Sequence, residues 1–201
     1  MNIAVLASGR GTNFGAIVRA VKKGAIKANL SLLLSDNPKA GAIGRARRAG
    51  VKVILVNRED FPAKKDFESR IIQHLREEKI DLIVLAGFMR ILGPDIIGEY
   101  KNRIINIHPA LLPSFKGAQA IKDAFDYGVK VTGVTVHFVD DLMDHGPIIL
   151  QEALSIKEGD TLESLEAKIH KIEHKLYPEA IKLFVEDKLK IEGRAVRVSA
   201  R

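Results

Sequence analysis

The sequence predicts an α/β fold, with a mostly parallel, twisted, Rossmann-like sheet and helices on both of its faces. Strand-like apolar runs alternate with amphipathic stretches through the first half of the 201 residues. Strands separated by helices of about ten residues are joined by right-handed crossovers in a parallel sheet. Ligands of such sheets bind at the carboxyl ends of the strands.

The first half follows this cycle from its first residues. Asn2–Ala7 is almost continuously apolar, which is typical of a strand buried on both faces. Gly9 and Gly11 interrupt the chain, and Asn13–Lys23 then has the apolar period of a helix. The cycle continues with strand Leu30–Leu34, helix Ala40–Ala49, strand Val51–Val56, helix Lys64–Glu78 and strand Asp81–Ala86.

The second half is less regular. Arg103–His108 is expected to be a buried strand that Pro109 ends, and the alternation in Val129–Val139 predicts a strand with one face toward water. Further predicted elements are a helix near Ala118–Tyr127, a strand over Pro147–Leu154 and a long helix over Thr161–Glu186. Thr161–Ser164 is not expected to form a clean capping box. The chain has no internal repeat or linker, so a single domain is expected.

Composition excludes several classes of protein. The absence of cysteine excludes disulfides, thiolate zinc sites, iron–sulfur clusters and cysteine nucleophiles. The net charge of +7 is spread along the chain, and aromatic residues make up only 5%, so nucleic-acid binding is not favoured. No apolar run approaches the roughly 20 residues of a membrane helix. The N-terminus lacks a secretory pattern, and a cytoplasmic location is expected.

A glycine-rich turn, Ser8–Asn13, follows the first predicted strand. The start of a helix presents unpaired N–H groups that can bind a phosphate, and Thr12 or Asn13 could cap that helix. A tight turn that binds nothing is the alternative. Asp36 resembles the acidic residue of a dinucleotide site, but Phe14 occupies the place of the third glycine of that motif, which disfavours NAD.

Asn106 and His108 lie at the end of a predicted strand and point to the same face, because strand side chains alternate. An amide and an imidazole can together stabilise an oxyanion and move a proton. The acidic loop Asp140–Pro147 could place a carboxylate beside His108 and raise the pKa of its imidazole. A solvated turn or a divalent-metal loop are alternatives that the spacing leaves open.

Other histidines are expected to have structural roles. His170–His174 matches the zinc motif H-x-x-E-H, but zinc catalysis needs a third ligand, and half-exposed histidines on a helix are the favoured interpretation. His74 and His137 are expected to serve packing or hydrogen bonding.

Together these motifs resemble those of a known family. NIHPALLPSFKG (106–117) resembles the N-x-H-P-S-L-L-P motif of the folate-dependent formyltransferases, and LAGFMRIL (85–92) resembles their pterin-binding segment. The spacing from Asn106 and His108 to Asp144, followed by Gly146-Pro147, fits their catalytic trio. SGRGTN (8–13) resembles the phosphate loop of the members that act on glycinamide ribonucleotide. The resemblance runs nearly end to end.

The resemblance implies direct transfer of a formyl group from 10-formyltetrahydrofolate to the amine of glycinamide ribonucleotide. The products are formylglycinamide ribonucleotide and tetrahydrofolate, in de novo purine biosynthesis, with no metal required. It also implies a single formyltransferase domain over 1–201, with a phosphate-binding half of about 1–100 and a folate and catalytic half of about 101–201.

The resemblance also implies residue roles. Asn106 and His108 would stabilise a tetrahedral oxyanion, with Asp144 holding His108 protonated. The substrate residues would be Gly11, Thr12, Asn13 and Glu173. The folate residues would be Lys64, Met89, Arg90, Ile91, Leu92, Asn106, Asp140, Asp141 and Asp144. Leu111–Gly128 would act as a lid. Three positions depart from the family pattern: Thr12 and Ala110 where Ser is usual, and Lys64 where Arg can stand.

The alternatives are another amine acceptor, such as a nucleotide-linked amino sugar or methionyl-tRNA, and a non-catalytic phosphate- or nucleotide-binding module. Methionyl-tRNA enzymes and formyltetrahydrofolate hydrolases carry additional domains, which this chain is not expected to hold. The expected partners are small molecules, with no nucleic acid and no membrane. The oligomeric state is left open, a homodimer included.

Overall fold

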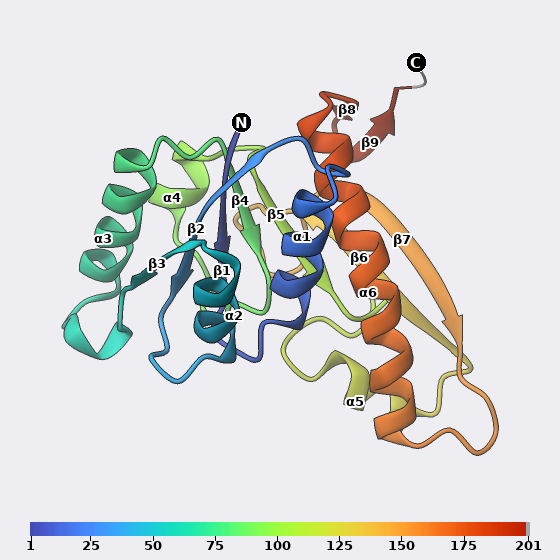
Figure 1. Ribbon diagram of the computed structural model, residues 1–201. Coiled ribbons are helices and arrows are strands. Elements are labelled where there is room, and N and C mark those ends of the chain that lie inside the picture. The colour runs from blue at the N-terminus through green and yellow to red at the C-terminus, as the bar shows by residue number, and fades with distance from the viewer. Residues whose placement is uncertain (200–201) are drawn as a thin grey trace. The chain divides into compact units, whose positions relative to one another are not determined.

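The predicted strands and helices all form, mostly within two residues of their expected bounds (Figure 1). The computed structural model describes residues 1–199. The chain divides into two compact units, residues 1–105 and 106–201. The expectation of one domain over the whole chain stays a prediction.

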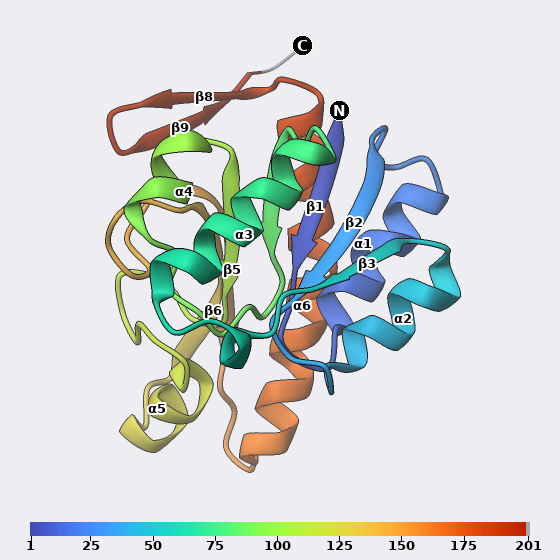
Figure 2. The same ribbon diagram turned by 90° about the vertical axis from the view of Figure 1, so that its left-hand side faces the viewer.

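The first unit is a parallel sheet between helices. Its elements are β1 (Asn2–Leu6), α1 (Thr12–Lys22), β2 (Asn29–Ser35), α2 (Gly41–Ala49), β3 (Lys52–Leu55), the 3-10 turn η1 (Arg58–Asp60), α3 (Lys64–Glu77), β4 (Leu82–Leu85) and α4 (Pro94–Glu99). The strand order is β3-β2-β1-β4, and each neighbouring pair is parallel. Helices α1 and α2 cover one face and α3 and α4 the other (Figures 1 and 2).

Burial on both faces explains why β1 and β4 are continuously apolar. Ile3, Val5, Leu82 and Val84 are all fully buried. A strand in this position has no solvent face, so the sequence shows no polar alternation. This packing places the carboxyl ends of β1, β2 and β4 at one edge of the sheet, where the glycine-rich turn begins.

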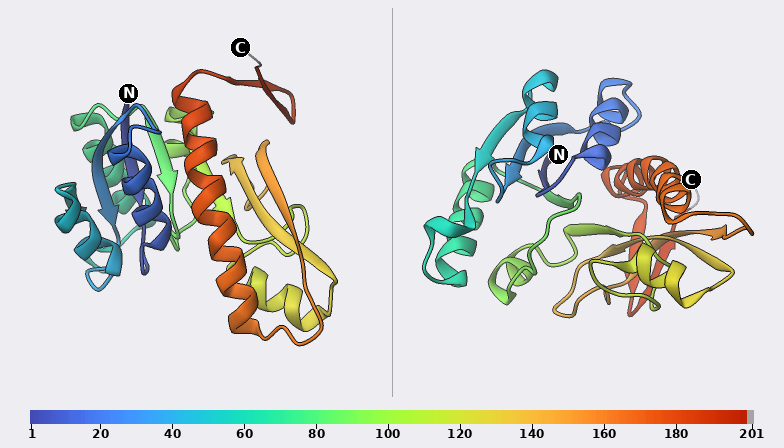
Figure 3. Two further views of the ribbon diagram at one scale, coloured as in Figure 1. Left: turned by 45° about the vertical axis from the view of Figure 1, so that its right-hand side comes forward. Right: turned by 90° about the horizontal axis from the view of Figure 1, so that it is seen from below.

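The second unit packs one long helix on an antiparallel strand pair. Its elements are the end of β5 (Ile104–His108), which begins in the first unit, α5 (Ala120–Tyr127), β6 (Val131–Phe138), β7 (Ile148–Ser155), α6 (Leu162–Val185), β8 (Leu189–Glu192) and β9 (Ala195–Val198). The strand order is β5-β6-β7-β9-β8. Helix α6 runs along β6 and β7 (Figure 3). The C-terminal hairpin β8–β9 joins β7 at Ile148 and Ala195.

Two expectations for the second unit were wrong. The strand over 129–139 has no wet face, because Gly133, Thr135 and His137, on the face that was expected to be wet, are all buried. Helix α6 does begin with a capping box, because Thr161 accepts from the Ser164 N–H while the Ser164 hydroxyl accepts from the Thr161 N–H. A serine at the third helical position thus replaces the glutamate or glutamine of the usual pattern.

The prediction of an α/β fold with a mostly parallel, helix-flanked sheet is confirmed. Helix α4 and the hairpin β8–β9 were not predicted. Among residues 1–199 no helix is both long and apolar enough to cross a membrane.

Candidate active site

Asn106 and His108 lie at the carboxyl end of β5, two residues apart and therefore on one face of the strand. His108 is 3% exposed, whereas Asn106 is half-buried. The intervening Ile107 faces the opposite layer and is buried. The strand thus presents an amide and an imidazole side by side, as the sequence predicted.

Asp144 is the residue of the acidic loop that meets this pair. Its Oδ2 lies 3.4 Å from His108 Nδ1, and its Oδ1 accepts from Asn106 Nδ2 at 3.5 Å. The Gly117 N–H donates to Oδ2 at 2.9 Å. Burial alone would raise the pKa of Asp144, but His137, the Gly117 N–H and His108 outweigh it and lower the pKa to about 2. Asp144 is therefore ionised at neutral pH, which decides between the carboxylates that the spacing left open.

The pKa of His108 shifts in the direction opposite to the expectation. His108 Nε2 lies 2.7 Å from the Phe115 carbonyl oxygen and donates to it, because a carbonyl oxygen can only accept. The other ring nitrogen, Nδ1, faces Asp144. Burial lowers the pKa of His108 below its ordinary value, and the opposing effects of Asp144 and the Phe115 carbonyl are smaller. The lowered pKa does not support the expectation that Asp144 holds His108 protonated, and the protonation state of His108 during transfer stays a prediction. A lowered pKa favours the neutral imidazole, in which Nδ1 can accept a proton.

His137 joins the same cluster from β6. Its Nδ1 donates to the Phe138 carbonyl at 2.7 Å, which leaves Nε2 3.2 Å from Asn106 Nδ2 and 3.7 Å from Asp144 Oδ1. The Asn106 amide can then donate to His137 Nε2 and to Asp144. His137 thereby fixes which end of the Asn106 side chain faces the cluster. The sequence predicted only a structural role for this residue.

The segment after His108 is held against β6 and β7 by one buried hydroxyl. Thr135 Oγ1 donates to the Ala110 carbonyl at 2.7 Å and accepts from the Leu112 N–H at 3.1 Å. Gln151 Nε2 donates to the same hydroxyl and to the Leu112 carbonyl. These bonds fix the start of the predicted lid (111–128), whose closing motion stays a prediction.

In the first unit, the glycine-rich turn leads directly into α1. Gly11 is the N-cap residue, with φ +72° and no side-chain cap, so the expectation that Thr12 or Asn13 caps the helix was wrong. The Ala42 N–H donates to the Gly9 carbonyl, which ties the turn to α2. The turn therefore leads into the start of a helix, a position where backbone N–H groups can bind a phosphate, and phosphate binding here stays a prediction.

Gly11 cannot be replaced by alanine without a collision. A Cβ at Gly11 would lie 2.6 Å from the Ala42 Cα, and the φ of +72° is itself unfavourable for alanine. Gly24 has the same φ of +72°, but a Cβ added at Gly24 would meet no atom within 4 Å, so Gly24→Ala is the matched control.

We expect Gly24→Ala to lower the free energy of unfolding by about 1 kcal/mol and Gly11→Ala by about 2–4 kcal/mol. Urea denaturation followed by circular dichroism measures both. Equal losses for the two variants would mean that the turn does not pack on α2 as described.

Asp36 is fully engaged inside the first unit. It is 4% exposed, and its two carboxylate oxygens accept from Ser8 Oγ at 2.5 Å and from Arg90 Nε at 2.7 Å. Ser8 Oγ in turn accepts from the Met89 N–H at 2.9 Å. Asp36 is therefore occupied by protein groups and not offered to a ribose, which weakens the dinucleotide alternative further. It links the glycine-rich turn to the segment after β4.

The predicted pterin segment follows β4. Met89 and Ile91 are both 65% exposed, whereas Leu92 is buried. Lys64 begins α3 and its Nζ lies 3.5 Å from Glu68 Oε1, so its ammonium already has a carboxylate beside it. The folate contacts of these residues stay predictions.

Glu173 lies on the buried side of α6 and is 5% exposed. His170 Nδ1 is 2.8 Å from its Oε2, and the rings of His170 and His174 are stacked 6.4 Å apart. The Glu173 charge also acts on His108, whose pKa it raises slightly. Within residues 1–199, no group of three His, Cys, Asp or Glu side chains is arranged to hold a metal ion.

The sequence profile of the formyl transferase family matches residues 1–181. The chain belongs to this family. The resemblance inferred from the sequence motifs is confirmed.

Relatives of the formyl transferase chain are similar over most of its length. It is 48% identical over 179 residues to phosphoribosylglycinamide formyltransferase of Bacillus subtilis, covering 89% of this chain and 92% of the relative. It is 41% identical over 183 residues to the trifunctional purine biosynthetic protein adenosine-3 of Gallus gallus, covering 91% of this chain and 18% of that protein.

Solved structures of formyl transferases have the same fold. Glycinamide ribonucleotide transformylase 1 from Symbiobacterium toebii superposes with a TM-score of 0.96 at 44% identity, covering 98% of this chain and 93% of that one. A formyltetrahydrofolate deformylase from Pseudomonas syringae gives 0.92 at 23% identity, covering 98% and 65%, which shows the fold alone.

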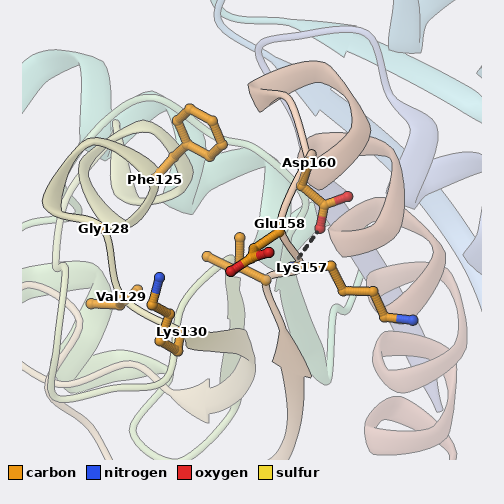
Figure 4. A pocket seen from close by; sticks show the side chains of 8 residues that line it. Phe125, Gly128, Val129, Lys130, Lys157, Glu158 and Asp160 are labelled. Carbon is orange, nitrogen blue, oxygen red and sulfur yellow. Dashed lines mark hydrogen bonds between the residues drawn. The ribbon is translucent and has the colours of Figure 1, made fainter.

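A surface hollow of about 340 Å³ in the second unit of this formyl transferase lies away from the polar cluster (Figure 4). It is lined by residues of 125–130 and 156–160. These residues adjoin the start of β6 and the end of β7, whereas His137 lies near the end of β6, about 20 Å along the strand. None of the predicted site residues lines this hollow.

Proposed function

We propose that this formyl transferase moves the formyl group of 10-formyltetrahydrofolate to the amine of glycinamide ribonucleotide. The main support for this proposal is that Asn106 and His108 both lie within hydrogen-bonding or ion-pairing distance of Asp144. The chain is also 48% identical to a phosphoribosylglycinamide formyltransferase. The products are formylglycinamide ribonucleotide and tetrahydrofolate.

Bond formation begins with attack of the substrate amine on the formyl carbon carried by N10 of the folate. The carbonyl electron pair moves to oxygen and gives a tetrahedral oxyanion. Asn106 Nδ2 donates to that oxygen. Its 3.5 Å bond to Asp144 is at the long limit for a hydrogen bond, so this N–H is readily redirected.

His108 transfers the proton from the attacking amine to N10 of the folate. As the amine attacks, its nitrogen becomes acidic, and the neutral Nδ1 accepts the proton while Nε2 stays bonded to Phe115. The imidazolium that results faces the ionised Asp144 at 3.4 Å. It then delivers the proton to N10 as the bond from N10 to the formyl carbon breaks, which leaves tetrahydrofolate.

The residues for substrate recognition are assigned from the resemblance to the family, one group at a time. We assign the phosphate to the backbone at Gly11, Thr12 and Asn13, where a helix begins without a side-chain cap. Glu173 would accept from the ribose hydroxyls. Met89–Leu92, Lys64 and Asp140–Asp144 would contact the folate, with Leu111–Gly128 as the lid.

The proposal involves small-molecule substrates and no metal, nucleic acid or membrane. The cytoplasmic location and the oligomeric state stay predictions.

The decisive assay combines the purified protein with glycinamide ribonucleotide and a 10-formyl folate and follows release of the deformylated folate by absorbance. We expect transfer by the wild type and a loss of about 10²–10⁴ in kcat for His108→Ala, because the proton acceptor is removed. Methionyl-tRNA and a nucleotide-linked amino sugar serve as alternative acceptors. Faster transfer to either acceptor, or an undiminished rate in His108→Ala, would contradict the proposal.

A further inference from the structure

The loop that presents Asp144, residues 139–147, is closed at its base. The Phe138 N–H donates to the Pro147 carbonyl at 2.9 Å, and a Cβ at Gly146 would overlap the Phe138 carbonyl oxygen. Asp144 itself has φ +48°, a backbone conformation that costs free energy for a residue with a side chain. The loop therefore needs further contacts to hold Asp144 in place.

Asp140 supplies one of these contacts from inside the loop. Its Oδ1 accepts from the Leu142 N–H at 3.1 Å, and its Oδ2 lies 2.8 Å from His145 Nδ1. A carboxylate can only accept, so Nδ1 of His145 carries the hydrogen. One side chain thus bridges the two ends of the loop on either side of Asp144.

Arg194 supplies the second contact from outside the loop. It lies in the turn between β8 and β9, and its Nη2 donates to the His145 carbonyl at 2.6 Å. Its Nη1 lies 3.1 Å from His145 Nε2 and 3.4 Å from His145 Nδ1, so the guanidinium lies over the face of the imidazole ring. The guanidinium therefore donates to the backbone of the residue that follows Asp144 and packs against its imidazole ring.

The hairpin is itself anchored next to these contacts. Ala195, directly after Arg194, pairs with Ile148, which directly follows the loop. Strands β8 and β9 pair over four positions, and Arg197 pairs with Glu192 across them. The hairpin lies beyond residue 181, where the match to the formyl transferase family ends.

We infer that Arg194 is a positioning residue for catalysis, and that the C-terminal hairpin β8–β9 braces the loop that carries Asp144. Arg194 acts through His145 and touches no reacting atom. This inference rests on the proposed function, because it assumes that the position of Asp144 limits turnover. Displacements of about 1 Å at a reacting centre can cost up to 10²-fold in rate.

The test compares Arg194→Ala and Arg194→Lys with Arg197→Ala, which removes a guanidinium from the same hairpin without touching the loop. We expect Arg194→Ala to lower kcat about tenfold, and Arg194→Lys to fall between this variant and the wild type, because lysine keeps the charge but loses the fork. The KM for glycinamide ribonucleotide should stay within about twofold in all three. Arg197→Ala should match the wild type.

Amide hydrogen exchange of residues 140–146 in the ligand-free protein provides a readout that does not depend on turnover. Arg194→Ala should exchange faster than Arg197→Ala over this loop. Identical kcat and identical exchange in these two variants would overturn the inference, as would faster exchange with unchanged kcat. If the wild type shows no transfer at all, the proposed function fails, and the exchange experiment still decides whether the hairpin braces the loop.

Discussion

Replacing Asp144 by Asn should lower kcat by about 10²–10⁴. Asp144 is ionised, with a pKa of about 2, and faces the nitrogen of His108 that takes up the proton. The amide keeps the size of the carboxylate but cannot stabilise the imidazolium. The variant is measured by steady-state kinetics from pH 5 to 9, together with thermal unfolding.

The pH dependence of the rate should also change in a defined direction when Asp144 is replaced. Neutral His108 is required, so the wild-type rate falls as the pH drops through a His108 pKa that lies below the ordinary value. Asp144 raises that pKa, so its loss should lower the pKa further and move the acidic limb to lower pH. Glu179→Gln, which removes a charge from α6, is the control. A near-normal kcat or an unmoved limb in Asp144→Asn would refute the role of this carboxylate.

Asn106→Ala should lower kcat by about 10²–10³, because one oxyanion donor is lost. Asn106 Nδ2 is the amide nitrogen nearest to the cluster, 3.2 Å from His137 Nε2 and 3.5 Å from Asp144 Oδ1. Because the oxyanion exists only in the transition state and intermediate, the KM values should change far less than kcat.

Steady-state kinetics with each substrate varied in turn measures this split. A rise in KM with unchanged kcat would assign Asn106 to ground-state binding instead. Thermal unfolding checks that Asn106→Ala is folded. If it is not, Asn106→Ser, which keeps a polar side chain, is measured in place of Asn106→Ala.

Much of the fold was predictable because periodicity follows burial directly. β1 and β4 are buried on both faces and therefore read as unbroken apolar runs. The hairpin β8–β9 was missed because its two strands have four residues each and are mostly exposed, so the local sequence carries little pattern. The hairpin is held in the sheet by pairing with β7, a contact between residues far apart in the sequence that the local sequence pattern does not predict.

The parts of the candidate site that lie within one short sequence motif could be predicted from the sequence. Asn106 and His108 share a face because strand side chains alternate, and the same alternation places Thr135 and His137 on one face of β6. The sequence therefore indicated that Thr135 and His137 share a face, but that face was expected to be exposed to water, so the two residues were not assigned to the site. The protonation of His108 could not be predicted, because it depends on how far burial outweighs the charge of Asp144.

The most direct test of this account is a ¹⁵N NMR titration of the His108 imidazole in the ligand-free protein, assigned by comparison with His108→Gln. We expect a neutral ring at pH 7.5, with the proton on Nε2 and none on Nδ1, and a pKa below the ordinary value of histidine. A ring that carries both protons at pH 7.5 would contradict the assignment of Nδ1 as the acceptor of the amine proton.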